Sequence, residues 1–258
     1  MKRLKRVPDS RRVLFAGGWR RALKRTAWAL IILVLAGASL LTFMVFFTSA
    51  FKIKEINFSG NANVSAEQLK QLGGMDAYSN LVTLPVGRIA RSMENNPWVK
   101  DVKVQRHLPH TVNIAIVERK PVGLFDYTSD AYLLEDDGFA IGKVPSDQFK
   151  ELPRVYAGEV PAPVVGSKVS DKKVLDCLAV LGGMPQTLRD TLLMGNPFDG
   201  RGPVFVSRNG YNVVYGRPTQ MSRKNEVLEA ILTDVKNNNR KIAYVDVRIP
   251  DSPVIKPL

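Results

Sequence analysis

The side chains that most often carry chemistry are few in this sequence of 258 residues. Its two histidines, His107 and His110, flank a Leu-Pro dipeptide, with no cysteine and only scattered carboxylates nearby. A zinc site normally takes three or four protein ligands, so this spacing predicts a turn and no metal centre. The acid pair Asp136-Asp137 precedes a glycine, which is typical of a solvated turn. We therefore expect no bound metal ion and no cofactor.

The single cysteine, Cys177, cannot form an intramolecular disulfide and lies in the apolar run Val174–Leu181. A free cysteine in such a run usually behaves as a small buried hydrophobic residue, so we expect an inert thiol. The sequence contains no glycine-rich phosphate loop, no Gly-x-Ser-x-Gly elbow and no His-Glu-x-x-His pair. These features favour a binding protein over an enzyme. An anchored periplasmic enzyme with an unfamiliar site is the alternative that this reasoning leaves open.

The formal charge of +13 is concentrated at the N-terminus. Residues 1–25 hold ten of the 37 lysines and arginines and one acid, and residues 26–51 carry no charge at all. As a helix, an apolar stretch of about 24 residues reaches about 36 Å, enough to cross a hydrocarbon core of about 30 Å. The basic residues predict that the tail stays cytoplasmic. A cleaved signal peptide is the other interpretation, but this run is longer than such an apolar region and ends in bulky residues.

The segment after the apolar run predicts a small domain with the order β-α-α-β-β. An apolar alternation marks a first strand, the pattern Ser65-Ala66-Glu67-Gln68 caps a first helix, and Pro85 suits the first turn of a second helix. Two alternating strands follow, with a turn between them. The predicted strands are Lys52–Ser59, Val99–Arg106 and Val112–Val117.

The rest of the chain predicts a β-rich domain with flanking helices. The dipeptide Asn209-Gly210 between alternating apolar residues is a strong hairpin signal. Residues 158–201 show little recognisable pattern apart from a helix. The expected strands are Val122–Tyr127, Ala131–Leu134, Val204–Ser207, Tyr211–Tyr215, Lys241–Arg248 and the short piece Pro253–Lys256, and the expected helices are Asp171–Leu181 and Met221–Asn237.

Several motifs in these two regions have a familiar spacing. Pro97-Trp98-Val99, a basic residue before a Leu-Pro turn, a β run and Glu118-Arg119-Lys120-Pro121 follow one another, and Tyr244-Val245-Asp246-Val247-Arg248 lies near the end of the chain. Together they resemble the bacterial cell-division FtsQ family, which is called DivIB in other lineages. The fold class expected is α+β: a basic cytoplasmic tail (1–25), a transmembrane helix (26–50), a POTRA domain (51–121) and an FtsQ-type mixed β domain with flanking helices (122–258).

The resemblance implies a noncatalytic scaffold of the division machinery, single-pass in the cytoplasmic (inner) membrane, mostly periplasmic and located at the division septum. It implies that the last strands bind FtsB in its complex with FtsL, because a short terminal strand can leave an edge to which a partner strand adds. By position, the residues expected to bind FtsB are Tyr244, Asp246, Arg248, Val254 and Ile255, and those expected on a POTRA recruitment face are Glu118, Arg119 and Pro121. A POTRA-bearing component of secretion or outer-membrane assembly is the alternative function.

Overall fold

The computed structural model describes residues 16–47, 49–127 and 130–258. Most of the basic tail and the centre of the turn expected at residues 128–130 lie outside the described residues. The fold class expected from the sequence is confirmed: an apolar helix precedes a β-α-α-β-β domain and a larger mixed sheet with helices.

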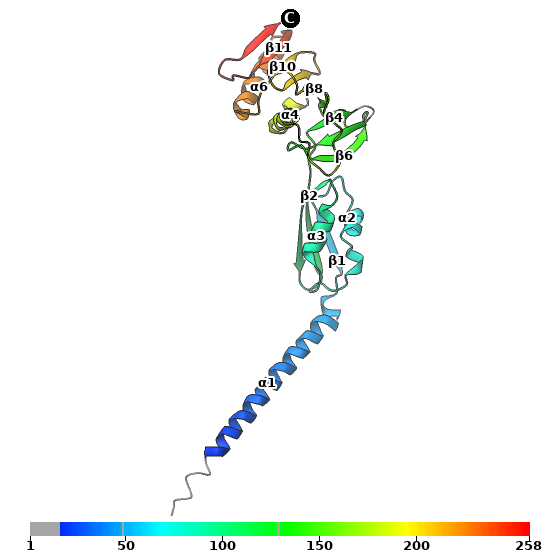
Figure 1. The fold of residues 1–258 in the computed structure, drawn as a ribbon, viewed down its shortest axis with the longest axis vertical. Coiled ribbons are helices and arrows are strands. Elements are labelled where there is room, and N and C mark those ends of the chain that lie inside the picture. Colours follow the sequence, from blue (N-terminus) through cyan, green and yellow to red (C-terminus); the bar gives the residue numbers. More distant parts are fainter. Residues whose placement is uncertain (1–15, 48, 128–129) are drawn as a thin grey trace, which may run out of the picture. The chain divides into compact units, whose positions relative to one another are not determined.

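The first element, α1 (Ala16–Phe47), is one continuous helix (Figure 1). Its segment Leu23–Met44 is long and apolar enough to cross a membrane, and all its side chains are exposed. A helix of this length with apolar residues all round has no polar face to turn toward water. It therefore fits the transmembrane anchor that the sequence predicts.

The chain divides into two compact units, and α1 belongs to the first of them. The first unit contains the residues up to 57 together with 76–85 and 105–113. Backbone hydrogen bonds join its separate segments. The Leu81 N–H donates to the Phe51 carbonyl at 2.8 Å, and the Lys54 N–H donates to the His110 carbonyl at 2.9 Å. The short helix η1 (Ser49–Phe51) also belongs to this unit.

The second unit contains residues 58–75, 86–104 and 114–258. It includes α2 (Ala66–Leu72) and α3 (Val86–Glu94), with η2 (Met75–Ala77) at its boundary. Ser65 and Gln68 form the capping box that the sequence predicts, since each side chain accepts from the other residue's backbone N–H. Leu69, Ile89 and Met93 are buried, as the helical pattern requires.

The chain also forms a three-stranded sheet, in the order β1-β3-β2. The strands are β1 (Glu55–Ser59), β2 (Val99–His107) and β3 (Thr111–Glu118). In β3 the alternate residues Val112, Ile114 and Ile116 are buried, so the face expected from the period of two is confirmed.

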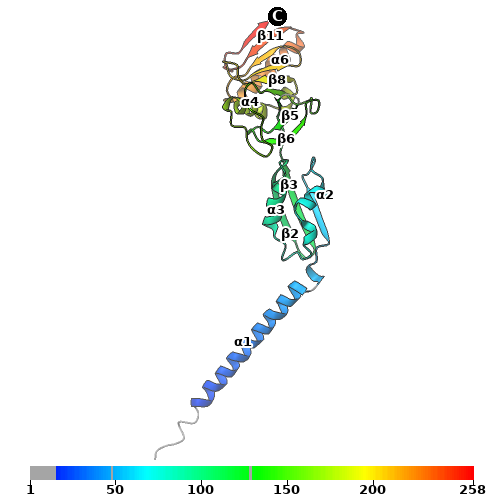
Figure 2. The ribbon, with the colours of Figure 1, turned by 45° about the vertical axis from the view of Figure 1, so that its right-hand side comes forward.

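A nine-stranded sheet forms the larger part of the second unit, in the order β12-β11-β10-β9-β8-β7-β4-β5-β6. Figure 2 labels β11, β8, β5 and β6 of this sheet. The sheet is mixed, because β4 with β7, β7 with β8, and β10 with β11 pair in parallel. The strands are β4 (Gly123–Tyr127), β5 (Asp130–Leu134), β6 (Ala140–Pro145), β7 (Arg154–Tyr156), β8 (Leu192–Asn196), β9 (Val204–Ser207), β10 (Asn212–Val214), β11 (Ile242–Asp246) and β12 (Val254–Pro257).

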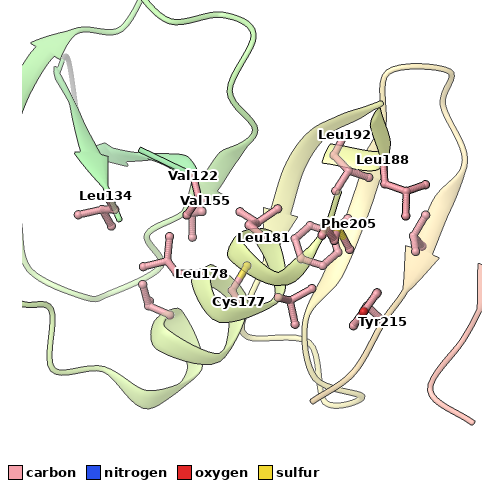
Figure 3. Close-up of a cluster of buried hydrophobic side chains, with 14 of the residues drawn as sticks. Val122, Leu134, Val155, Cys177, Leu178, Leu181, Leu188, Leu192, Phe205 and Tyr215 are labelled. Carbon is pink, nitrogen blue, oxygen red and sulfur yellow. The ribbon is translucent and has the colours of Figure 1, made fainter. Parts of the chain in front are cut away.

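The core of this sheet is built around α4 (Lys172–Gly183). Cys177, Leu178 and Leu181 form one buried cluster with the strand residues Val155 and Phe205 (Figure 3). The helices α5 (Gln186–Arg189) and α6 (Met221–Asn237) add Leu188 and Leu228 to the same cluster. The thiol of Cys177 is fully buried, as expected, and burial raises its pKa.

Three strands of this sheet were not expected from the sequence, namely β6, β7 and β8. Strand β7 has only three residues, and β7 and β8 pair in parallel with each other, so their pairing depends on segments that are distant in sequence. The expected strand Lys241–Arg248 is also shorter in the structure, because pairing ends at Asp246 and Arg248 lies in the following turn.

Replacing a central core residue should measure how much the packing around α4 contributes to the free energy of unfolding. Leu178→Ala should lower the free energy of unfolding by about 2–5 kcal/mol, because it removes apolar contacts and leaves a cavity. The measurement is the urea dependence of Cys177 alkylation in the full chain in detergent, since this buried thiol reacts only when the core opens.

The matched control is Val164→Ala, because Val164 is 71% exposed. It should change the free energy of unfolding by no more than about 0.5 kcal/mol. Equal urea midpoints for Leu178→Ala and the unmodified chain would contradict the assigned core.

Candidate functional site

The end strand β12 is the most exposed part of the nine-stranded sheet. It pairs with β11 in antiparallel register, with Tyr244 opposite Lys256 and Asp246 opposite Val254. Within the described ranges 16–47, 49–127 and 130–258, no strand pairs with its other side. All four of its residues are exposed. The outer side of β12 is therefore an edge that can accept another strand.

The preceding elements place β12 at this edge. Strand β10 runs parallel to β11, with Val213 beside Val245, and two parallel strands need a long connection. The connection is α6, whose Leu228 is buried against the sheet. Strand β11 then turns back through residues 247–253 into β12.

The five residues expected to bind a partner come together here but do not share one face. Opposite residues of an antiparallel pair lie on the same face, so Tyr244, Asp246 and Val254 lie on one side of the sheet. Ile255 lies opposite Val245 and therefore on the other side, which α4 and α6 cover. Val254 and Ile255 are 50% and 41% exposed, so both sides of the edge present apolar surface.

Arg248 belongs to this group through an ion pair, although it lies outside the strand. Its guanidinium Nη2 and Nε donate to Asp246 Oδ2 at 2.7 and 3.0 Å. Partial burial raises the pKa of the Asp246 carboxyl, but the hydrogen bonds from Arg248 outweigh this and leave the pKa below its ordinary value. Asp246 therefore stays charged near neutral pH and holds Arg248 in place.

Sequence reasoning missed a second ion pair beside the first. Arg201 Nε donates to Asp199 Oδ1 at 2.9 Å, and these hydrogen bonds lower the pKa of Asp199 to about 2. Arg201 also helps to lower the pKa of Asp246. Asp199 and Arg201 lie in the β8–β9 turn, which the sequence pattern did not resolve, so no signal placed them near β11.

The buried Lys224 binds the loop after β10, which contacts Arg248. Lys224 Nζ donates to the Tyr215 and Arg217 carbonyls at 3.1 and 2.9 Å. Desolvation lowers the pKa of this amine, and the two carbonyls supply part of the hydrogen bonding that water would give. Between them, Gly216 has a φ of +70°, and a Cβ there would lie 2.8 Å from Arg248 Cγ. A larger residue at position 216 would therefore displace Arg248.

The residues expected on a POTRA recruitment face form contacts within the chain. The Glu118 carboxylate accepts from the backbone N–H groups of Ala62, Asn63 and Val64 at 2.8–3.0 Å. These backbone donors outweigh the effect of desolvation, which acts to raise the Glu118 pKa, so the pKa is lowered. Arg119 binds a buried carboxylate, and Pro121 is half-buried. Their role toward a partner stays a prediction.

The remaining candidates for chemistry lie apart from the edge. His107 is exposed, His110 Nδ1 lies 3.1 Å from the Lys52 carbonyl oxygen, and Asp137 pairs with Lys168 at 2.6 Å. Across the part of the chain that the structure describes, no three His, Cys, Asp or Glu side chains cluster as a metal site would require. A cavity of about 1020 Å³ beside Phe198 is lined by Tyr156 and residues of the 158–172 segment, none of which belongs to β11 or β12.

Comparisons with known proteins match this architecture. The family model described as "POTRA domain, FtsQ-type" matches residues 51–119. A cell division protein FtsQ from Agrobacterium fabrum is 29% identical over 105 residues, 41% of this chain and 33% of that protein. One from Rhizobium meliloti is 31% identical over 105 residues, 41% of this chain and 34% of that protein. A third, from Bartonella bacilliformis, is 22% identical over 204 residues, 79% of this chain and 62% of that protein.

The matched part thus spans about a third of the length of the first two relatives. The POTRA model matches the β-α-α-β-β domain, which follows an apolar helix long enough to span a membrane and precedes a mixed sheet. The resemblance to the FtsQ family predicted from the sequence is confirmed by the family model and by these relatives.

The Asp246–Arg248 pair gives a testable pH dependence. Asp246 has a lowered pKa in the folded protein, so its contribution to stability is present above its unfolded pKa and is lost as pH falls through the folded pKa. Arg248→Gln should raise the pKa of the Asp246 carboxyl toward its ordinary value of about 3.9, because the guanidinium donors are removed. The measurement is an NMR titration of labelled Asp carboxyls.

The matched control is Arg240→Gln, which removes an arginine paired with Asp234 at 3.3 Å, outside the Asp246 group. It should leave the Asp246 pKa unchanged. An Asp246 pKa that does not rise in Arg248→Gln would show that the ion pair is absent in solution.

Proposed function

We propose that this protein is a noncatalytic scaffold of the bacterial division machinery that binds partner proteins through the edge strand β12. The observation that carries the proposal is the exposed outer side of β12, paired on one side only within the described residues. The confirmed family resemblance supports a cell-division role, since the relatives are named cell division protein FtsQ. FtsB, in its complex with FtsL, is the partner that the resemblance suggests.

Binding would occur by addition of a partner strand. Backbone N–H and C=O groups on the outer side of β12 would supply the affinity, and alternate side chains would supply specificity. On one face the partner would meet Val254 and Lys256, next to Tyr244 and Asp246. On the other face it would cover Ile255, whose side chain is 41% exposed. Burial of Ile255 would extend the core face of the sheet by one strand.

The other parts of the chain would hold this edge at the division site. The helix α1 would anchor the protein in the cytoplasmic membrane, with the basic residues of 1–25 on the cytoplasmic side. The POTRA domain would make recruitment contacts with other division proteins. The residues proposed for these contacts are Glu118, Arg119 and Pro121, and the neighbouring Lys120 is exposed.

A charged residue on either face of the edge should weaken partner binding. Ile255→Asp and Tyr244→Asp should each reduce the affinity for purified FtsB–FtsL more than about tenfold, because an acid would be buried without a partner, and about 1.4 kcal/mol corresponds to tenfold. The measurement is a titration of the full chain in nanodiscs with labelled FtsB–FtsL.

The control is Val165→Asp, because Val165 is 40% exposed, almost as much as Ile255, and lies on another surface. It should leave the affinity unchanged. Unchanged affinity in both edge variants would refute strand addition at β12 while leaving the fold and the membrane anchor intact.

Depletion of the protein in cells tests the wider role. Filamentous cells that divide again when a fluorescent fusion forms a midcell band would support a division scaffold. Normal cell length, with defects in secretion or outer-membrane assembly, would favour the alternative function. A fluorescent fusion that carries Ile255→Asp should then show whether recruitment to midcell requires binding at β12.

A further inference from the structure

Two of the sequence motifs that carry the family resemblance meet inside the second unit. Trp98 precedes β2, Arg119 follows β3, and both lie against the strands β4–β6. The Arg119 N–H donates to the Trp98 carbonyl at 2.9 Å, so the ends of β2 and β3 are tied to each other at this point. The contacts beyond this bond are ionic and apolar.

Glu135 is the centre of the ionic contact. It follows β5 and is one of the four polar or charged residues that are buried among the described residues. One carboxylate oxygen accepts from Lys100 Nζ at 2.6 Å, and the other accepts from Arg119 Nη1 at 2.6 Å. A buried carboxylate is costly unless it is paired, and both of its partners here come from the POTRA strands and their flank.

Arg119 is held from a second side by an aromatic ring. Its guanidinium carbon lies 3.6 Å from the centre of the Phe139 ring, in the turn between β5 and β6. Such stacking suits the planar guanidinium, which a lysine could not reproduce. Among the described residues, Arg119 Nε is buried without a hydrogen-bond partner, while the guanidinium contacts Glu135 and Phe139.

Trp98 adds the apolar contact. It packs on a small cluster formed by Leu124, Ala131, Leu133 and Ile141, which belong to β4, β5 and β6. This cluster is separate from the larger core around α4. Two contacts therefore hold the POTRA segments of the second unit against β4–β6. One is the Trp98 side chain, and the other is the ion pairs of Glu135 with Lys100 and Arg119.

We propose that Glu135, Arg119, Lys100 and Trp98 form an interdomain clamp, which makes the ends of β2 and β3 and the nine-stranded sheet move as one rigid body. The Pro-Trp-Val and Glu-Arg-x-Pro motifs then have a positioning role inside the chain. Glu135 is the positioning residue on which the clamp depends, because it is the acid that both cations share. Sequence reasoning assigned no role to this residue.

The proposal is tested by the distance between two spin labels in the full chain in nanodiscs. The labels are attached at Gln71→Cys in α2 and Ala230→Cys in α6, both exposed positions of the second unit. The native Cys177 is buried and stays unlabelled. With an intact clamp, pulsed electron resonance should give one narrow distance distribution. Glu135→Gln should at least double its width, because the carboxylate charge that holds both cations is lost.

The control variant is Asp130→Asn, which removes an exposed ion pair between Asp130 and Lys143 within β5 and β6. It should leave the width unchanged. Unchanged width and mean distance in Glu135→Gln would overturn the proposal.

Continued protection of Cys177 from alkylation shows that a variant has kept its core. If Glu135→Gln exposes Cys177, the variant Lys100→Gln decides, because the Lys100 side chain is 47% exposed and its loss leaves the core packed. A broader distribution in Lys100→Gln supports the clamp, and an unchanged one overturns it. None of these measurements involves FtsB–FtsL, so they are independent of the proposed function.

Discussion

The parallel pairing of β10 with β11 is the constraint on which the position of the candidate site depends. Two parallel neighbours cannot be joined by a tight turn, so the chain crosses over through α6 before it can form β11. The crossover buries Leu228 against the core and brings Val245 into register with Val213. The antiparallel return into β12 then places a short exposed strand at the end of the sheet. The exposed edge that we propose binds a partner is thus a consequence of the connection, and the core around α4 holds it in place.

Charged groups hold the irregular segments around this framework. Glu118 binds three successive backbone N–H groups after β1, Asp246 holds Arg248 beside β11, and Lys224 binds the carbonyls of the loop after β10. Each charge has a defined partner, which offsets part of the cost of removing it from water. These contacts position backbone and side chains. They fit a protein whose proposed work is binding, in which the geometry of an edge matters more than the reactivity of any residue.

The elements predicted most accurately are those whose pattern is local. Met221–Asn237 was expected as a helix and has these bounds in the structure, and the capping box at Ser65 and the buried face of β3 were also expected. The strands β7 and β8 were not expected, because they pair in parallel with strands that are distant in sequence. Strand β6, which pairs with its neighbour β5, was also not expected. Arg248 was expected inside a strand, but its guanidinium binds Asp246 from the following turn. Ile255 was grouped with Tyr244, although the register places them on opposite faces.

The sequence by itself determined the apolar anchor segment, the β-α-α-β-β order, the α+β class and the family resemblance, because each rests on spacing along the chain. Only the tertiary structure decided which residues share a face of the edge strand, and that Arg201 lies near Asp246. It also decided that Glu135, 16 residues after Arg119, is the buried acid to which Arg119 and Lys100 both bind. The reason is physical: local patterns follow from the periods of helices and strands, whereas register and charge pairing depend on segments that meet only when the sheet closes.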